Sequence, residues 1–220
     1  MHISCPKGCT RRAWRIAPHV LAIEPAGLMR RGSASRATRI ATPHGIGDAY
    51  AQMVSKVRHL GTAPALEVYD DLHGVGGLFI PDNWVIAVGL KDIADISDRI
   101  LSTRHDDVAA IARDLARTKG PRVDDLRGLL IVSGMVRCVG HELGHALIHR
   151  GWVNPFSPDG EAGADYYAGQ IDAARGTDWR LGEMFFRAIG CRGPTCSHPS
   201  PENRSTAYMT GYENMRFRAA

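Results

Sequence analysis

The segment HELGHALIHR, residues 141–150, constrains the fold of this chain more than any other part of the sequence. It continues an apolar run, LLIVSGMVRCVG at 129–140. Residues four positions apart lie on one face of an α-helix, so the pattern predicts one long helix from about residue 125 to Gly151. Three histidines would lie along that helix at intervals of four: His141, His145 and His149.

Two of these histidines can share a metal ion, but all three cannot. Imidazoles at positions i and i+4 rise ~6 Å along the helix and can converge on one zinc ion. His141 and His149 are ~12 Å apart along the axis. Glu142 completes an H-E-x-x-H motif, in which the glutamate can serve as a general base, whereas Ala146 takes that place between His145 and His149. We therefore assign His141 and His145 as ligands and His149 as a polar residue near the helix end.

A catalytic zinc ion usually has three protein ligands and one open position, so a third ligand is needed. The segment PDGEAGADYYAG, residues 158–169, offers Glu161 and Asp165 on one helical face. Antiparallel packing of the two helices would bring Glu161 to the metal. Asp165 could then accept the outer N–H of a ligand histidine and fix its tautomer. Gly144 in the first helix leaves room for a close neighbour.

The remaining periodicities predict an α+β fold, mostly helical, with a small β-sheet or hairpin ahead of the H-E-x-x-H helix. Ser200 is the expected cap of the last helix and Pro201 its first residue. The expected helices are 48–61, 91–101, 106–118, 160–175 and 178–189, and the expected strands are 65–71, 78–81 and 84–89.

Charge divides the 220 residues into two regions. Residues 1–47 carry Lys7 and seven arginines against Glu24, a net charge of +7, whereas 48–220 carry 19 basic and 22 acidic groups. We expect a basic, disordered arm at 1–47 and one domain at 48–220. The arm could be a targeting segment, a nucleic-acid contact or an over-long start. Neither a clear signal peptide nor an apolar stretch of membrane-spanning length is present, so we expect a soluble protein, either cytoplasmic or exported.

Five cysteines in a chain of this length do not form a disulfide framework. Cys138 lies within the apolar helix pattern. Cys191 and Cys196 flank a short loop and could form a local bridge or remain two reduced thiols.

HELGH at 141–145 and EAGAD at 161–165 resemble the motifs of gluzincin metallopeptidases, in particular the family of the CAAX prenyl protease, HtpX and the OMA protease. The strand–turn–strand pattern at 65–90 is similar to the hairpin of that family, and SHPSPENR at 197–204 is similar to its His-Pro and Arg segment. The resemblance implies a zincin-like fold and a soluble, minimal zinc metalloendopeptidase. One Zn²⁺ ion would activate water, with Glu142 as general base.

The resemblance also implies that His198 and Arg204 stabilise the oxyanion, with Tyr208 as a third candidate. Alternatives stay open for each residue. His198 could pack at a helix cap or act as an inhibitory fourth ligand, and Arg204 could form a salt bridge with Glu202 or Asp165.

The substrate implied by this family is an extended or unfolded peptide, which could add a strand at the edge of segment 78–81 or 84–88. Two other functions compete with this one. One is a non-catalytic, zinc-stabilised interaction domain. The other is a cytosolic H-E-x-x-H peptidase whose basic arm binds nucleic acid. Trp14 is the only aromatic residue of the arm, so base stacking has little support and we do not expect a nucleic-acid partner.

Overall fold

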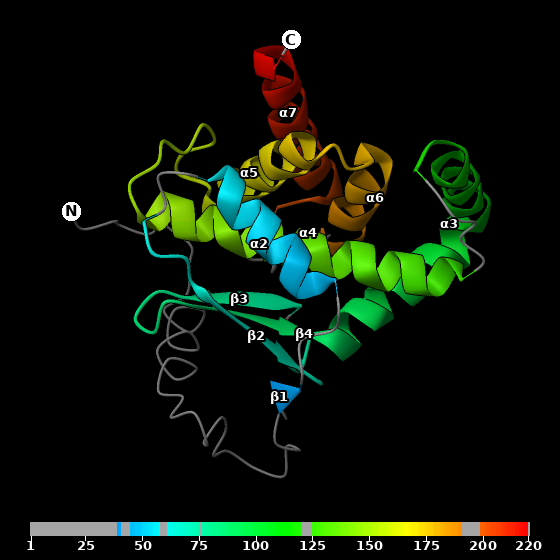
Figure 1. The fold of residues 1–220 in the computed structure, drawn as a ribbon, viewed down its shortest axis with the longest axis horizontal. Coiled ribbons are helices and arrows are strands. Elements are labelled where there is room, and N and C mark those ends of the chain that lie inside the picture. Colours follow the sequence, from blue (N-terminus) through cyan, green and yellow to red (C-terminus); the bar gives the residue numbers. More distant parts are fainter. Residues whose placement is uncertain are drawn as a thin grey trace.

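A computed structural model describes residues 39–40, 45–57, 61–74, 76–119, 125–190 and 199–219 of the chain. The fold is α+β, with a small mixed sheet beside a larger group of helices (Figure 1). In chain order the elements are β1 (Arg39–Ile40), α2 (Ile46–Lys56), β2 (Ala65–Tyr69), β3 (Gly77–Ile80), β4 (Val85–Gly89), α3 (Leu90–Lys119), α4 (Leu126–His149), α5 (Gly160–Arg175), α6 (Trp179–Ile189) and α7 (Pro201–Ala219).

The sheet has the strand order β1-β2-β4-β3. β3 and β4 form the predicted antiparallel hairpin, and β2 lies parallel to β4 on its other side. Trp84 closes the hairpin turn in the left-handed region (φ 53°), and its indole Nε1 donates to the Thr62 carbonyl at 2.7 Å. Because β4 is flanked on both sides, segment 84–88 offers no open edge, and that expectation is wrong. The alternative segment, 78–81, lies largely in the outer strand β3.

Helix α4 is the centre of the fold. In Figure 1 it crosses the molecule between the sheet and helices α5 and α6, and it also contacts α2 and α3. Every residue from Ser133 to Gly144 is buried, because neighbouring elements surround this part of the helix. Asp125 caps its N-terminus by accepting a hydrogen bond from Gly128 N at 2.8 Å. The predicted long apolar helix is confirmed.

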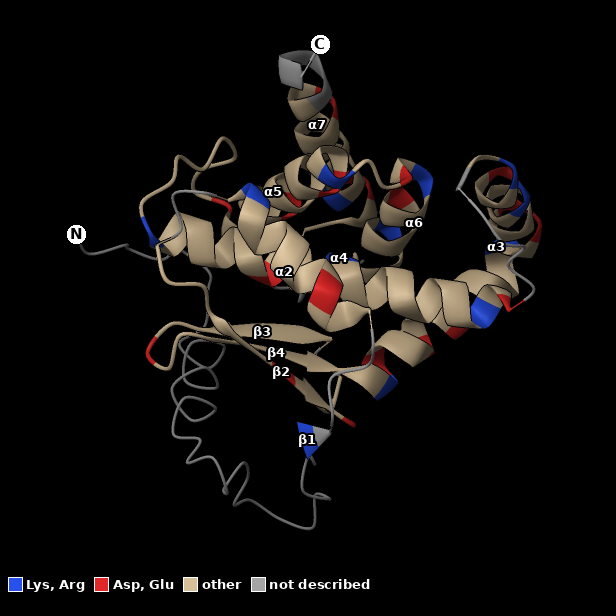
Figure 2. Cartoon of the chain, in the orientation of Figure 1, with Lys and Arg blue, Asp and Glu red and all other residues tan. Residues whose placement is uncertain are grey.

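Helix α3 joins the two helices expected at 91–101 and 106–118. Non-helical dihedral angles at Arg104 (φ −135°, ψ 27°) kink it between them. Charged side chains are frequent along α3, whereas the middle of α4 carries few (Figure 2). The acidic residues of segment 91–101 follow a helical spacing typical of a solvated face. Asp92 departs from that pattern, because it is buried and accepts hydrogen bonds from Leu72 N (2.9 Å) and Gly74 N (2.7 Å).

The folded unit begins earlier than expected. Arg39 and Ile40, assigned to the arm, pair with β2, and Arg39 forms a 2.9 Å ion pair with Glu67. Ile46 is only 1% exposed. The disorder expected for the rest of the arm concerns residues 1–38 and 41–44, which lie outside the described residues. Across the described segments, none of the helices has both the length and the apolar character required to cross a membrane.

Candidate metal centre

His141, His145 and Glu161 bring three potential metal ligands together. Nε2 of His141 lies 3.1 Å from Nε2 of His145 and 3.3 Å from Oε2 of Glu161. Nε2 of His145 lies 3.4 Å from Oε1 of Glu161. A tetrahedral ion with bonds of about 2.1 Å holds its ligand atoms about 3.4 Å apart. These three side chains could therefore hold one metal ion, and the expected juxtaposition is confirmed.

Gly144 lets α5 approach α4 at the level of the ligands. A Cβ atom at this position would lie 2.6 Å from the carbonyl oxygen of Ala164 and 2.8 Å from its Cα. Both atoms belong to the backbone of α5, so only glycine fits without moving that helix. The room expected at Gly144 is thus filled by α5, the helix that carries Glu161.

The loop between α4 and α5 fixes where α5 begins. Asp159 caps the helix, with Oδ1 accepting from Glu161 N at 3.0 Å and from Ala162 N at 3.1 Å. Asn154 braces the loop by donating to the Asp159 carbonyl at 2.8 Å and accepting from Phe156 N at 2.8 Å. Glu161 is consequently held in the first turn of α5, opposite the two histidines.

Asp165 links His141 to Arg204. Its Oδ1 lies 2.7 Å from Nδ1 of His141, the contact expected from the sequence. Arg204, from α7, donates to both oxygens of Asp165, from Nη2 at 2.7 Å and from Nε at 2.9 Å. Arg204 Nη2 also lies 3.8 Å from Glu161 Oε2. The observed contact is thus the Asp165 salt bridge that the sequence left open as the alternative to an oxyanion role for Arg204.

The charges around the three ligands favour a cation. Burial opposes protonation of His141, but Asp165 and Glu161 outweigh it and raise the His141 pKa to about 10. Burial likewise opposes ionisation of Glu161, yet hydrogen bonds with His141 and His145 lower the Glu161 pKa far below its usual range. A proton thus stabilises the cluster when no other cation does so, and a metal ion would replace it.

Glu142 lies beside the ligands but points toward the sheet. It is buried, and a Cβ atom built on Gly77 of β3 would lie 3.0 Å from its Oε1. Because β3 is an outer strand, the carboxylate of Glu142 lies next to the edge of the sheet. This position suits a base that acts on a molecule bound along that edge.

No family model, curated protein or solved structure matches the chain. The resemblance to gluzincin peptidases, drawn from the motifs at 141–145 and 161–165, therefore stays a prediction. Both motifs face the same point between α4 and α5.

Other predicted residues lie away from the ligands or outside the described part of the chain. His149 ends α4 in an exposed position, 5.9 Å from the Phe79 ring and 6.1 Å from the Trp84 ring between centroids, so it is not a ligand. The hydroxyl of Tyr208 is buried and donates to Asp172. His198 lies outside the described residues, as do Cys191 and Cys196, so the roles expected for them stay predictions.

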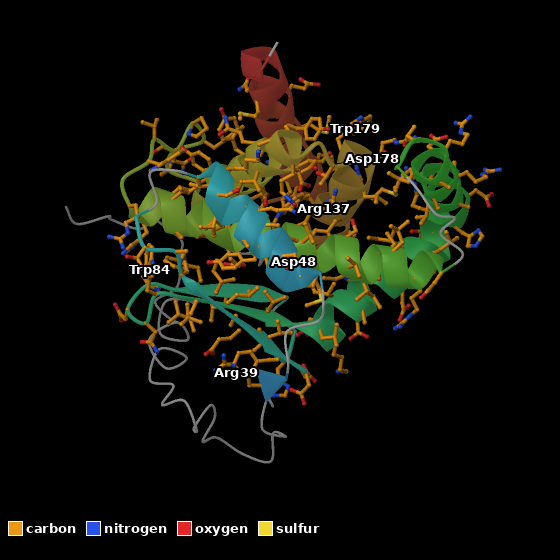
Figure 3. The ribbon with its side chains drawn as sticks, viewed as in Figure 1. Arg39, Asp48, Trp84, Arg137, Asp178 and Trp179 are labelled. Atoms are coloured by element: carbon orange, nitrogen blue, oxygen red, sulfur yellow. The ribbon has the colours of Figure 1, made fainter. Side chains whose placement is uncertain are left out.

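A buried ionic cluster one turn before His141 was not predicted. Arg137 lies 3.2 Å from Asp172 through Nε and Oδ2, and it donates to the Asp178 carbonyl at 2.9 Å (Figure 3). Tyr208 donates to the same Asp172 oxygen at 2.9 Å. The cluster joins α4, α5, α7 and the start of α6 behind the metal ligands. Its one signal in the sequence is the arginine that interrupts the apolar run at 129–140.

Proposed function

We propose that the chain is a zinc-dependent metalloendopeptidase with a zincin-like fold. The observation that carries this proposal is the spacing of 3.1 to 3.4 Å between the ligand atoms of His141, His145 and Glu161. Two imidazoles and one carboxylate form a common catalytic zinc set, with the fourth position left for water or substrate. Magnesium and calcium prefer oxygen ligands, so the two nitrogens favour zinc.

The chain's own residues divide the remaining work. When bound, zinc would supply a Lewis acid that polarises a peptide carbonyl and acidifies water. Glu142 would accept the proton of the attacking water and pass it to the leaving amine. Asp165 would accept the Nδ1–H of His141, which leaves the Nε2 lone pair free to bind the ion. Arg204 would hold the Asp165 carboxylate in place through its two hydrogen bonds.

The outer edge of β3, which pairs with no further strand among the described residues, supports an extended peptide as substrate. Gly89 N donates to the Gly76 carbonyl at 3.0 Å, so Gly76 and Gly89 form a hydrogen-bonded pair directly before the β3–β4 ladder. Antiparallel pairs alternate, and the main-chain groups of Gly77 and Phe79 therefore point away from β4. A peptide added there would bind through its backbone, next to Glu142. Such binding selects unfolded or extended segments and depends little on the side chains that they carry.

Metal analysis combined with digestion of casein or a peptide library tests the proposal. We expect one zinc ion per chain and internal cleavage by the wild type. Glu142→Gln should keep the zinc ion and the fold but lose hydrolysis, since an amide cannot accept the proton. A chain that binds zinc but is inactive as wild type would instead favour the non-catalytic interaction domain. A chain that binds no zinc would refute both.

A further inference from the structure

Gly77 makes room for two side chains of α4. A Cβ atom at Gly77 would overlap Sγ of Cys138 and would lie 3.0 Å from Oε1 and 3.1 Å from Cγ of Glu142. Separations under 3.0 Å are essentially never seen for Cβ atoms. Because Gly77 has no side chain, the Cys138 thiol and the Glu142 carboxylate can both occupy the space next to β3.

Cys138 and Glu142 are one helical turn apart and both are buried, at 5% and 6% exposure. Burial raises the pKa of the Cys138 thiol well above its usual range, and the nearby Glu142 charge raises it further. Cys138 is therefore a neutral, compact neighbour that occupies the space beside the carboxylate. Glu142 is confined by its own helix, by the thiol and by the Gly77 backbone.

The same glycine lies in β3, an outer strand of the described sheet. Its main-chain N–H and carbonyl point away from β4, while the position of its missing Cβ faces Glu142. A peptide paired with β3 would therefore lie at a distance from the Glu142 carboxylate that Gly77 determines. The preceding residue, Gly76, could not do this, because the position of its missing Cβ faces Ile93 and Ile96 of α3 instead.

We propose that Gly77 and Cys138 are positioning residues, which together hold the Glu142 carboxylate at the edge of β3 in reach of the bound peptide. This inference rests on the proposed peptidase function. It adds two residues that position Glu142 and lie outside both metal motifs. Gly77 lies on the hairpin, and Cys138 lies one turn before Glu142 on α4.

Gly77→Ala tests the inference, with Gly76→Ala as matched control. An added methyl group at Gly77 must displace Sγ of Cys138 by roughly 1 Å and the Glu142 side chain by a few tenths of an ångström, so kcat should fall roughly 10- to 100-fold. Zinc affinity should stay unchanged, since no ligand atom is among the displaced groups. At Gly76 the new Cβ would meet Ile93 Cδ1 at 3.4 Å, an ordinary contact, and kcat should stay at the wild-type value.

The double variant Gly77→Ala/Cys138→Ala separates positioning from general damage. Removing Sγ relieves the closest overlap, and the methyl group added at position 77 then takes the place of the thiol beside Glu142, so most of the lost kcat should return. In the zinc-free chain, the urea midpoint of the double variant should likewise exceed the value obtained by adding the two single effects. A double variant as slow as Gly77→Ala, or a Gly77→Ala chain with full kcat, overturns the inference. An inactive wild type refutes the peptidase proposal, whereas the urea measurement still tests the contact itself.

Discussion

Replacing Gly144 by alanine tests whether the close approach of α4 and α5 creates the metal centre. The new Cβ would lie 2.6 Å from the Ala164 carbonyl oxygen, whereas ordinary contact begins at 3.4 Å. The atoms in the way are backbone, so no side chain can rotate to relieve the overlap. Helix α5 must retreat from α4 by roughly 0.8 Å.

That displacement exceeds the tolerance of a zinc site, in which bond lengths hold to within about 0.2 Å. Glu161 moves with α5 while both histidines stay on α4. We expect zinc affinity to fall about 10- to 100-fold, which equals about 1.4 to 2.7 kcal/mol of binding free energy. Overpacking should also lower the free energy of unfolding by about 1 to 3 kcal/mol.

Competition with a chromophoric chelator measures the affinity, and thermal unfolding with and without zinc measures the stability. Gly140→Ala is the matched control, because it lies one turn earlier on α4 and its Cβ would meet Ala168 at 3.8 Å. It should bind zinc normally and gain up to about 1 kcal/mol of stability from helix propensity. If Gly144→Ala binds zinc as tightly as the wild type and unfolds at the same temperature, the spacing of the two helices does not determine the site.

Three further predictions concern charge. Asp165→Asn leaves Arg204 buried beside a neutral partner and replaces one of the two acceptor oxygens shared by Arg204 and His141 with an NH2 group, so zinc affinity should fall about 10- to 100-fold in a chelator titration. Asp172→Asn leaves Arg137 without its buried counterion and should lower the unfolding free energy by about 3 to 5 kcal/mol in urea, with zinc stoichiometry unchanged. In chelator, stability should decline as pH rises from 6.5 to about 10, because the folded protein holds a proton on His141 more tightly than the unfolded chain. Zinc should abolish that decline in thermal unfolding scans, since the ion replaces the proton, and an equal decline with zinc bound would contradict this assignment.

Local patterns predicted the elements and the ligand set well. The helix expected at 160–175 has those bounds, because Asp159 caps it and Gly176 ends it in the left-handed conformation. His141, His145 and Glu161 were identifiable because helical spacing places them on facing surfaces once two helices pack together. These features depend on residues that are close in the sequence or on one short connection.

Features that depend on distant contacts were not predictable in the same way. Strand β2 pairs in parallel with β4, although β3 lies between them in the sequence, and this non-local pairing decides which strand is outermost. Asp92 belongs to a series of acidic residues whose spacing is typical of a solvated helix face. Its carboxylate is nevertheless buried, because it accepts hydrogen bonds from Leu72 N and Gly74 N of the preceding loop. Arg39 joins the sheet through a two-residue strand, too short for any periodicity to reveal.

The guanidinium that neutralises Asp165 comes from α7, the last helix described, while both metal motifs precede it in the chain. During synthesis a ribosome therefore delivers the three ligands before it delivers Arg204. Until that helix docks, a carboxylate with no exposure in the finished protein lacks the guanidinium that donates to both its oxygens, and its burial is less favourable. Maturation of the centre is thereby tied to the arrival of a segment that supplies no metal ligand and contacts the centre at Asp165, His141 and Glu161.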